Sequence, residues 1–124
     1  MRISPERFEQ LAFETADSVL AELPDDLRAE AETVLLEIAD QATPAQAGGR
    51  PGSVLGLYQG VPLVSRHADS VILYPDRITL FRLPLASLAR TEVELRRQLR
   101  KTLVHELGHF FGFDEYELDE RGWG

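Results

Sequence analysis

Two histidines stand four residues apart in the segment His105-Glu106-Leu107-Gly108-His109, and this spacing could build a metal site. In a helix each residue turns the chain by about 100°, so residues four apart lie on one face. Both imidazoles can then direct a nitrogen at a single ion. Glu106 is rotated by about 100° from His105, so its carboxylate can reach a water molecule held by that ion. Two neutral nitrogen ligands beside a carboxylate base are what a zinc-dependent hydrolase needs.

A catalytic zinc site has three protein ligands and leaves a fourth position for water. Gly112 is placed to end the helix and to turn the chain back towards the histidines. The carboxylates that follow this turn are Asp114 and Glu115. We favour Glu115 as the third metal ligand, with Asp114 as the alternative. Asp114 also suits the capping position of the acidic segment that follows, so one carboxylate can bind metal while the other caps.

Other interpretations of the histidine pair stay open at this point. The histidines could be hydrogen-bonded to buried protein groups, with Glu106 in a salt bridge. The site could also bind zinc without catalysis, or hold it as a purely structural ion. We prefer a catalytic site because residues 103–111 carry no ionisable groups besides the two histidines and Glu106. Three ionisable groups in an apolar segment are costly unless they are paired or bind a metal.

Residues 105–115, HELGHFFGFDE, resemble the extended zinc-binding motif of the metzincin peptidases, His-Glu-x-x-His-x-x-Gly-x-x-His/Asp. Residues 55–63, LGLYQGVPL, the hairpin expected after them and the closing Gly122-Trp123 are similar to a small bacterial family of minimal, zincin-like metalloproteases. The resemblance covers most of the chain.

This resemblance implies a small α+β domain, in which a small mixed or antiparallel β-sheet packs against the zinc-motif helix and an N-terminal helix. It implies a zinc ion held by His105, His109 and an acidic third ligand, with Glu106 as the general base. The family pattern has Asp at the third-ligand position, where this chain has Glu115. Met1 is the only methionine, so the chain has no residue for the methionine turn of larger metzincins.

The helix that carries the motif is the most strongly marked element of the sequence. Thr91 to Glu94 fits a capping box, in which the threonine oxygen and the glutamate satisfy backbone donors of the first turn. No proline interrupts residues 92–111, and Gly112 follows. We therefore expect one helix over residues 92–111.

Two further helices are expected near the N-terminus. Ser4 and Pro5 are typical of a helix start, and Pro24 ends this first segment. A short second helix is expected over roughly residues 25–32. Residues 33–38 fit either a continuation of that helix or a strand, because an apolar run this short has no decisive periodicity.

The middle of the chain is expected to supply the sheet. The residues of segment 41–53 are mostly Gly, Pro and Ala, so we predict a loop. Three strands are expected after it, the last two as a hairpin that Pro84 ends, over residues 54–58, 71–74 and 78–83.

Length, charge and cysteine content limit the number of domains, the kinds of partner and the compartment that we expect. With 124 residues the chain is long enough for one domain, and we expect residues 1–124 to form it. A formal net charge of −8 argues against nucleic-acid and membrane partners, since both require a positive surface. The apolar runs are shorter than the roughly 20 residues of a membrane-spanning helix, and the first residues lack the apolar stretch of a secretory signal, so we expect neither feature. The absence of cysteine excludes a thiol nucleophile and suits a reducing compartment, so we expect a cytoplasmic protein.

We therefore predict a zinc-dependent metallopeptidase whose substrate is a peptide or a protein. Zinc would lower the pKa of its bound water towards about 7 and polarise the scissile carbonyl. Glu106 would take the proton of the water and pass it to the leaving amine. Residues 54–64 could offer a strand edge to an extended peptide. The alternative from another class is a non-catalytic metal-binding or partner-binding domain on a degenerate zincin fold.

Overall fold

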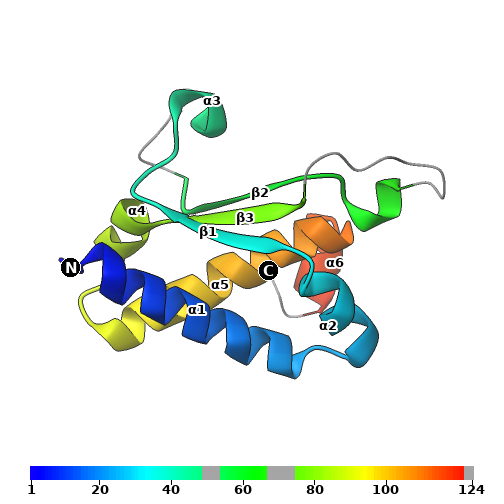
Figure 1. Ribbon diagram of the computed structural model, residues 1–124, viewed down its shortest axis with the longest axis horizontal. Coiled ribbons are helices and arrows are strands. Elements are labelled where there is room, and N and C mark those ends of the chain that lie inside the picture. The colour runs from blue at the N-terminus through cyan, green and yellow to red at the C-terminus, as the bar shows by residue number, and fades with distance from the viewer. Residues whose placement is uncertain (49–53, 67–74, 122–124) are drawn as a thin grey trace.

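The structure is a computed structural model that describes residues 1–48, 54–66 and 75–121 (Figure 1). Its elements, in chain order, are α1 (Pro5–Glu22), α2 (Asp25–Ala31), β1 (Leu35–Ala39), α3 (Pro44–Ala47), β2 (Gly56–Gln59), the 3₁₀ turn η1 (Leu63–Ser65), β3 (Arg77–Phe81), α4 (Arg82–Ser87), α5 (Glu92–Phe111) and α6 (Glu115–Glu120). The α+β class predicted from the sequence is confirmed.

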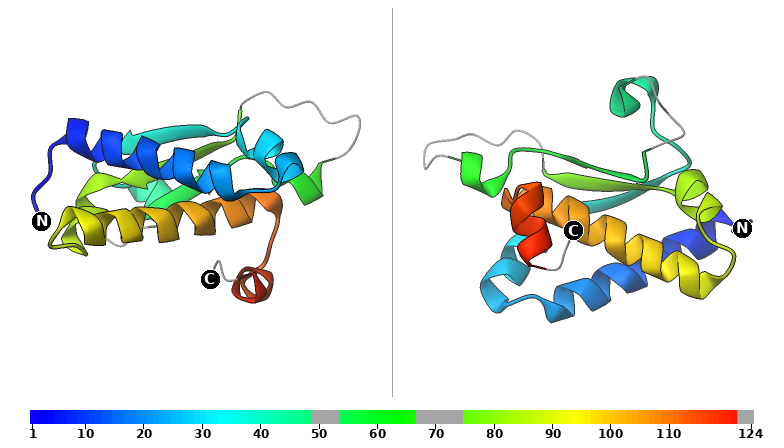
Figure 2. Two further views of the ribbon diagram at one scale, coloured as in Figure 1. Left: turned by 90° about the horizontal axis from the view of Figure 1, so that it is seen from below. Right: turned by 180° about the vertical axis from the view of Figure 1, so that it is seen from behind.

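The two long helices, α1 and α5, lie side by side on the same face of the sheet (Figure 1, Figure 2). Ion pairs join the two helices at corresponding positions along their lengths. Arg7 near the start of α1 pairs with Glu92 at the start of α5 at 2.6 Å, and Glu14 pairs with Arg96 at 2.9 Å. The two helices therefore run in the same direction, and α5 carries the predicted motif towards its far end.

The sheet is mixed and has the strand order β1-β3-β2. Strand β1 runs parallel to β3, whereas β2 runs antiparallel to it. Ile78 of β3 stands between Leu36 of β1 and Tyr58 of β2. Within the described part of the chain, β1 and β2 are both edge strands.

A stripe of leucines along α5 forms the centre of the core. Its members recur every four residues, which places them along one side of the helix. They pack with buried side chains of α1 and of the central strand. The buried set includes Leu95, Leu99, Leu103 and Leu107 of α5, Phe8 and Leu11 of α1, and Ile78 and Leu80 of β3. Each such side chain contributes about 1.5–3 kcal/mol of burial free energy, so this stripe fixes the rotation of α5 about its axis.

Most helices predicted from the sequence are confirmed. Helix α1 begins after Ser4, whose hydroxyl accepts the N–H of Arg7 at 3.1 Å, and it ends before Pro24. Helix α2 occupies the predicted second helix. Of residues 33–38, for which the sequence allows helix or strand, residues 35–38 belong to β1, which ends one residue later at Ala39. Parallel pairing with β3 settles that choice, and no local pattern could have supplied it.

Helix α5 also matches its predicted bounds. The hydroxyl of Thr91 accepts the N–H of Glu94 at 3.2 Å, as the capping box requires. The second bond of the box differs, because the Glu94 carboxylate accepts the N–H of Arg90 at 2.8 Å. The helix start is therefore capped from both sides, with the glutamate reaching one residue further back than predicted.

Two predictions for the middle of the chain were wrong. The loop predicted over 41–53 contains α3, where Thr43 and Gln46 form a full capping box. The strand predicted to run up to Pro84 ends at Phe81, and α4 follows directly. Pro84 lies in the first turn of α4, where a missing N–H costs nothing because that group has no partner within the helix.

Other predictions fall outside the described residues. They concern the strand at 71–74, and with it the first arm of the hairpin, and the closing Gly122-Trp123. The antiparallel neighbour of β3 that the structure does describe is β2.

Gly112 ends α5 in the left-handed conformation, with φ of 87°. Its N–H donates to the carbonyl of His109 at 3.0 Å, and the N–H of Phe113 donates to Gly108 at 2.9 Å. Val64 of η1 packs so closely against this turn that a side chain at Gly112 would overlap it. The turn thus depends on glycine twice, for its backbone angle and for space.

Gly112 and Gly48 form a matched pair for testing this turn, because both have positive φ but only Gly112 is crowded. We expect Gly48→Ala to cost about 1 kcal/mol of unfolding free energy, from backbone strain alone. Gly112→Ala should cost about 1–3 kcal/mol more, because the new methyl group collides with Val64. Urea unfolding of both variants in chelator-containing buffer measures the difference, and equal losses would contradict the packing described.

Candidate metal centre

Three potential metal ligands gather near the C-terminal end of α5. They are His105, Glu106 and His109, and one ligand atom from each lies within 4.8 Å of the others. Both histidines are half-buried, and Glu106 is only 7% exposed. The leucine stripe of α5 accounts for this arrangement, since the histidines stand about half a turn round the helix from Leu103 and Leu107.

The distance between the two imidazoles fits a zinc ion. The Nε2 atoms of His105 and His109 are 3.1 Å apart. Zn–N bonds of about 2.0–2.1 Å at a tetrahedral angle place two ligand nitrogens about 3.3 Å apart. The separation of the two rings therefore suits the binding of one ion. One carboxylate oxygen of Glu106 lies within 4.8 Å of a ring nitrogen of each histidine, a suitable distance to contact a water molecule beside such an ion.

The structure gives one of the two third-ligand candidates a definite role. Asp114 is exposed, and its Oδ1 accepts the N–H of Glu117 at 2.8 Å, which caps α6. Glu115 is the first residue of α6, and its side chain lies outside the described part of the structure. The capping bond agrees with the interpretation in which Asp114 caps and Glu115 binds metal. The identity of the third ligand stays a prediction.

A hollow of about 560 Å³ opens beside His105 and Glu106. One wall is α5, and the other is formed by residues 54–56 at the start of β2. The two walls meet closely, because a Cβ on Gly56 would stand 2.6 Å from Cγ2 of Thr102. Glycine at this position lets the backbone of β2 lie directly against the helix, one turn before Glu106.

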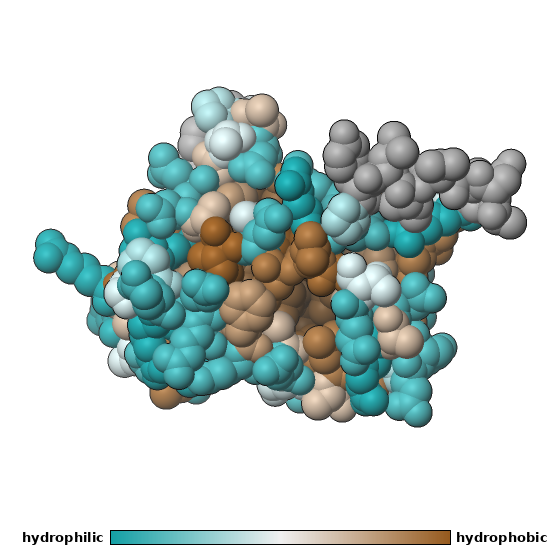
Figure 3. Space-filling view, in the orientation of Figure 1, coloured by the Kyte–Doolittle hydropathy of each residue, from teal (hydrophilic) through white to brown (hydrophobic). Residues whose placement is uncertain are grey.

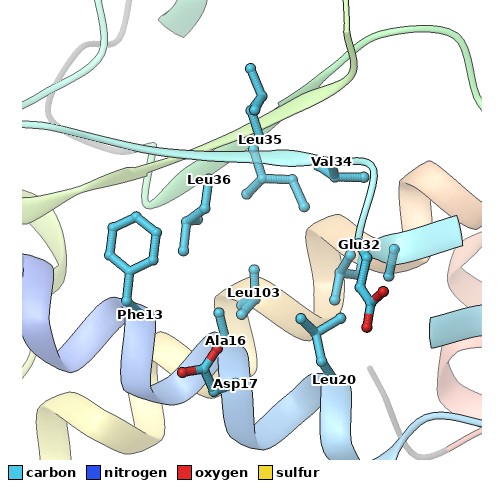
Figure 4. Close-up of a pocket in the computed structure, with 12 residues that line it drawn as sticks. Phe13, Ala16, Asp17, Leu20, Glu32, Val34, Leu35, Leu36 and Leu103 are labelled. Carbon is cyan, nitrogen blue, oxygen red and sulfur yellow. The ribbon is translucent and has the colours of Figure 1, made fainter. Parts of the chain in front are cut away.

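A second hollow, of about 360 Å³, lies between α1, α2 and β1 (Figure 3, Figure 4). Its lining is apolar, as Phe13 and Leu36 illustrate, and its only ionisable side chains are Asp17 and Glu32. Among the described residues, the only group that could hold a metal ion is the one on α5. Of these two hollows, only the one beside His105 is lined by residues of the group that could hold a metal ion.

A buried carboxylate near the end of α5 was not foreseen from the sequence. Asp76 is 5% exposed and accepts the hydroxyl of Tyr58 at 2.7 Å and the N–H of Val61 at 3.1 Å. It also pairs with Arg66, whose guanidinium lies over the ring of Phe110. These bonds fix the segment between β2 and η1 against the helix. A Pro-Asp turn in the sequence gave no sign of them, because all the partners are distant along the chain.

Tyr58 and Tyr116 each carry a hydroxyl that could donate to a developing oxyanion, and the sequence alone favours packing at the core edge for both. Burial, with the hydrogen bond to Asp76, raises the pKa of Tyr58 above its ordinary range. The Tyr58 hydroxyl is thus engaged by Asp76, and its ring packs edge-on against Phe110. Tyr116 is 71% exposed, so packing at the core edge was wrong for it. His67, the third histidine of the chain, lies outside the described residues.

Comparison with known families agrees with this geometry. The sequence model of the zincin-like metallopeptidase family matches residues 30–123, most of the chain, and the chain belongs to that family. A comparison with curated proteins finds no match. Family membership and the His105, Glu106 and His109 group together indicate a zinc-binding, protease-like site. No described helix is long and apolar enough to cross a membrane.

Substitutions in the motif should separate metal binding from the role of the carboxylate. His105→Ala and His109→Ala should each reduce bound zinc from about one equivalent to a small fraction, since each removes one of few ligands. Glu106→Gln should keep the metal. Elemental analysis after dialysis against dilute zinc measures the content. Glu30→Gln, at an exposed carboxylate on α2, controls for adventitious binding, and wild-type zinc content in both histidine variants would contradict the site.

Removal of the Tyr58 hydroxyl should destabilise the hydrogen-bonded contacts of Asp76 near the end of α5. We expect Tyr58→Phe to cost about 1–1.5 kcal/mol of unfolding free energy, because buried Asp76 loses a donor. Tyr116→Phe, at an exposed ring, should cost almost nothing. Urea unfolding provides the comparison. An absorbance titration should also show one tyrosine ionising above the usual range in wild type and not in Tyr58→Phe, and its persistence there would contradict the assignment.

Proposed function

We propose that this protein is a zinc-dependent metallopeptidase that hydrolyses peptide bonds. The observation that carries the proposal is the pair of imidazole nitrogens 3.1 Å apart on one helix face, with a nearly buried carboxylate beside them at the wall of a hollow. His105 and His109 are the proposed metal ligands, and Glu115 is the proposed third. Membership of the zincin-like family supports this assignment.

In the proposed reaction the protein supplies a base, a proton carrier and a binding surface. A zinc ion held here would supply Lewis acidity, which polarises the scissile carbonyl and acidifies water. Glu106 accepts a proton from the attacking water and delivers it to the amine nitrogen as the C–N bond breaks. Its burial reduces competition from bulk solvent for the carboxylate oxygens. Its place beside both histidines keeps the base within reach of the reacting atoms.

The proposed substrate lies along β2 in an extended conformation. Among the described elements, β2 pairs with β3 alone, and the proposed substrate binds as a further strand at the other edge of β2. Residues 54–56 at its start already form a wall of the hollow beside His105. A peptide added to this edge would therefore carry its backbone past the histidine pair. Main-chain hydrogen bonds of this kind hold a peptide with little regard to its side chains.

The second candidate function is a non-catalytic metal-binding or partner-binding domain. A distance of 3.1 Å between the Nε2 atoms also suits a hydrogen bond between the two rings, without any ion. On that interpretation Glu106 has no reacting water to activate, and its replacement would leave binding unchanged.

The decisive comparison is between wild type and Glu106→Gln, both loaded with zinc. We expect wild type to cleave a mixture of unstructured peptides, with new termini identified by mass spectrometry. The variant should be slower by about 10²–10⁴-fold, because the general base is lost while the ligands remain. Glu30→Gln serves as the matched control and should cleave normally. Equal cleavage by Glu106→Gln, or no cleavage by zinc-loaded wild type, would support the non-catalytic candidate instead.

A further inference from the structure

The cations that precede the motif on α5 fall into two sets. Arg96 and Arg100 face α1, and each pairs with a glutamate of that helix. Arg97 and Lys101 are exposed, and neither forms an ion pair or hydrogen bond with a described residue. Within the described chain, the positive charges on one side of the helix are thus neutralised and those on the other side are not.

The unneutralised set is aligned with the candidate metal ligands. Arg97, Lys101 and His105 follow one another at intervals of four residues, so they form a row with about 6 Å between neighbours along the helix axis. Lys101 and His105 line the same hollow of about 560 Å³. Gln98 and Thr102 add polar groups to the same wall. A ligand that reaches His105 along this hollow therefore passes the ammonium group of Lys101.

The charge of the whole molecule makes this position distinctive. The formal net charge is −8, and Lys101 is the only lysine in the chain. The net charge disfavours the approach of an anionic ligand at long range, whereas Lys101 places a positive charge at this end of the hollow, one turn of α5 from His105 and Glu106. An ammonium group offers three donors on a flexible stem, so it can adjust to a carboxylate without a fixed geometry.

We propose that this end of the hollow is a subsite for a substrate carboxylate, with Lys101 as the principal contact and Arg97 one turn further away. The proposal rests on the proposed peptidase function, since it makes Lys101 a residue that selects acidic peptides. The carboxylate can belong to an Asp or Glu side chain or to the C-terminus of a short peptide. The chemistry is the same, and the experiment distinguishes the two sources.

Peptide binding to zinc-loaded Glu106→Gln tests the subsite without requiring hydrolysis. The probes are fluorescent peptides of one sequence, with Glu or Gln beside an apolar centre and with a free or an amidated C-terminus. We expect a carboxylate to tighten binding by about 2- to 5-fold, as for one exposed ion pair. This preference should diminish with added salt. A preference that follows the Glu peptide identifies a side-chain carboxylate, and one that follows the free C-terminus identifies a terminal carboxylate.

Substitutions at Lys101 assign the preference. In the Glu106→Gln background, Lys101→Met should abolish the preference, and Lys101→Glu should reverse it through repulsion. Arg96→Gln removes the same charge from the other side of α5 and should leave the preference unchanged. The subsite is overturned if neither form of carboxylate tightens binding, or if Lys101→Met keeps the preference.

The two proposals fail in different ways. If zinc-loaded wild type cleaves peptides without regard to their charge, the subsite is wrong and the peptidase function stands. If carboxylate binding depends on Lys101 but no peptide is cleaved, the peptidase function is wrong and the binding site stands.

Discussion

The packing of α5 against the sheet and α1 is the constraint on which the candidate site depends. The leucine stripe of this helix is buried with Ile78, Leu80 and residues of α1, so the helix cannot rotate without exposing several apolar side chains. With the rotation fixed, the spacing of four residues places His105 and His109 on the face of α5 opposite the leucine stripe. Their Nε2 atoms are 3.1 Å apart. Local helical geometry supplies the spacing, and tertiary packing decides which way the spacing faces.

Segments that are distant in the sequence pack around the histidine face of α5. Gly56 allows the backbone of β2 to lie against Thr102, which creates the wall opposite the helix. At the other end, Val64 packs on the Gly112 turn, and Asp76 gathers Arg66 and the hydroxyl of Tyr58. These contacts hold the turn that directs the chain towards the acidic third-ligand candidates. The site is thus supported on both sides of the histidine pair by glycine contacts that a larger residue would disrupt.

The sequence predicted the elements whose signals are local. The capped helix over 92–111 and the Ser4-Pro5 start of α1 follow from residues adjacent in the chain, and the structure has both. Residues 33–38 could not be decided, because their strand depends on pairing with β3, some forty residues later. The contacts of Asp76 could not be predicted for the same reason, because its partners are distant along the chain. Pro84 was misinterpreted as a strand terminator because a proline is also well accommodated in the first turn of a helix.

The most direct test of the account is the position of a metal ion in crystals of the zinc-loaded protein. An anomalous difference map recorded above the zinc edge should show one strong peak about 2.0–2.1 Å from Nε2 of both His105 and His109. A carboxylate from beyond Gly112 should approach the same peak. A map without a peak at the histidine pair, or with the two rings hydrogen-bonded to each other after soaking in zinc, would contradict the central claim.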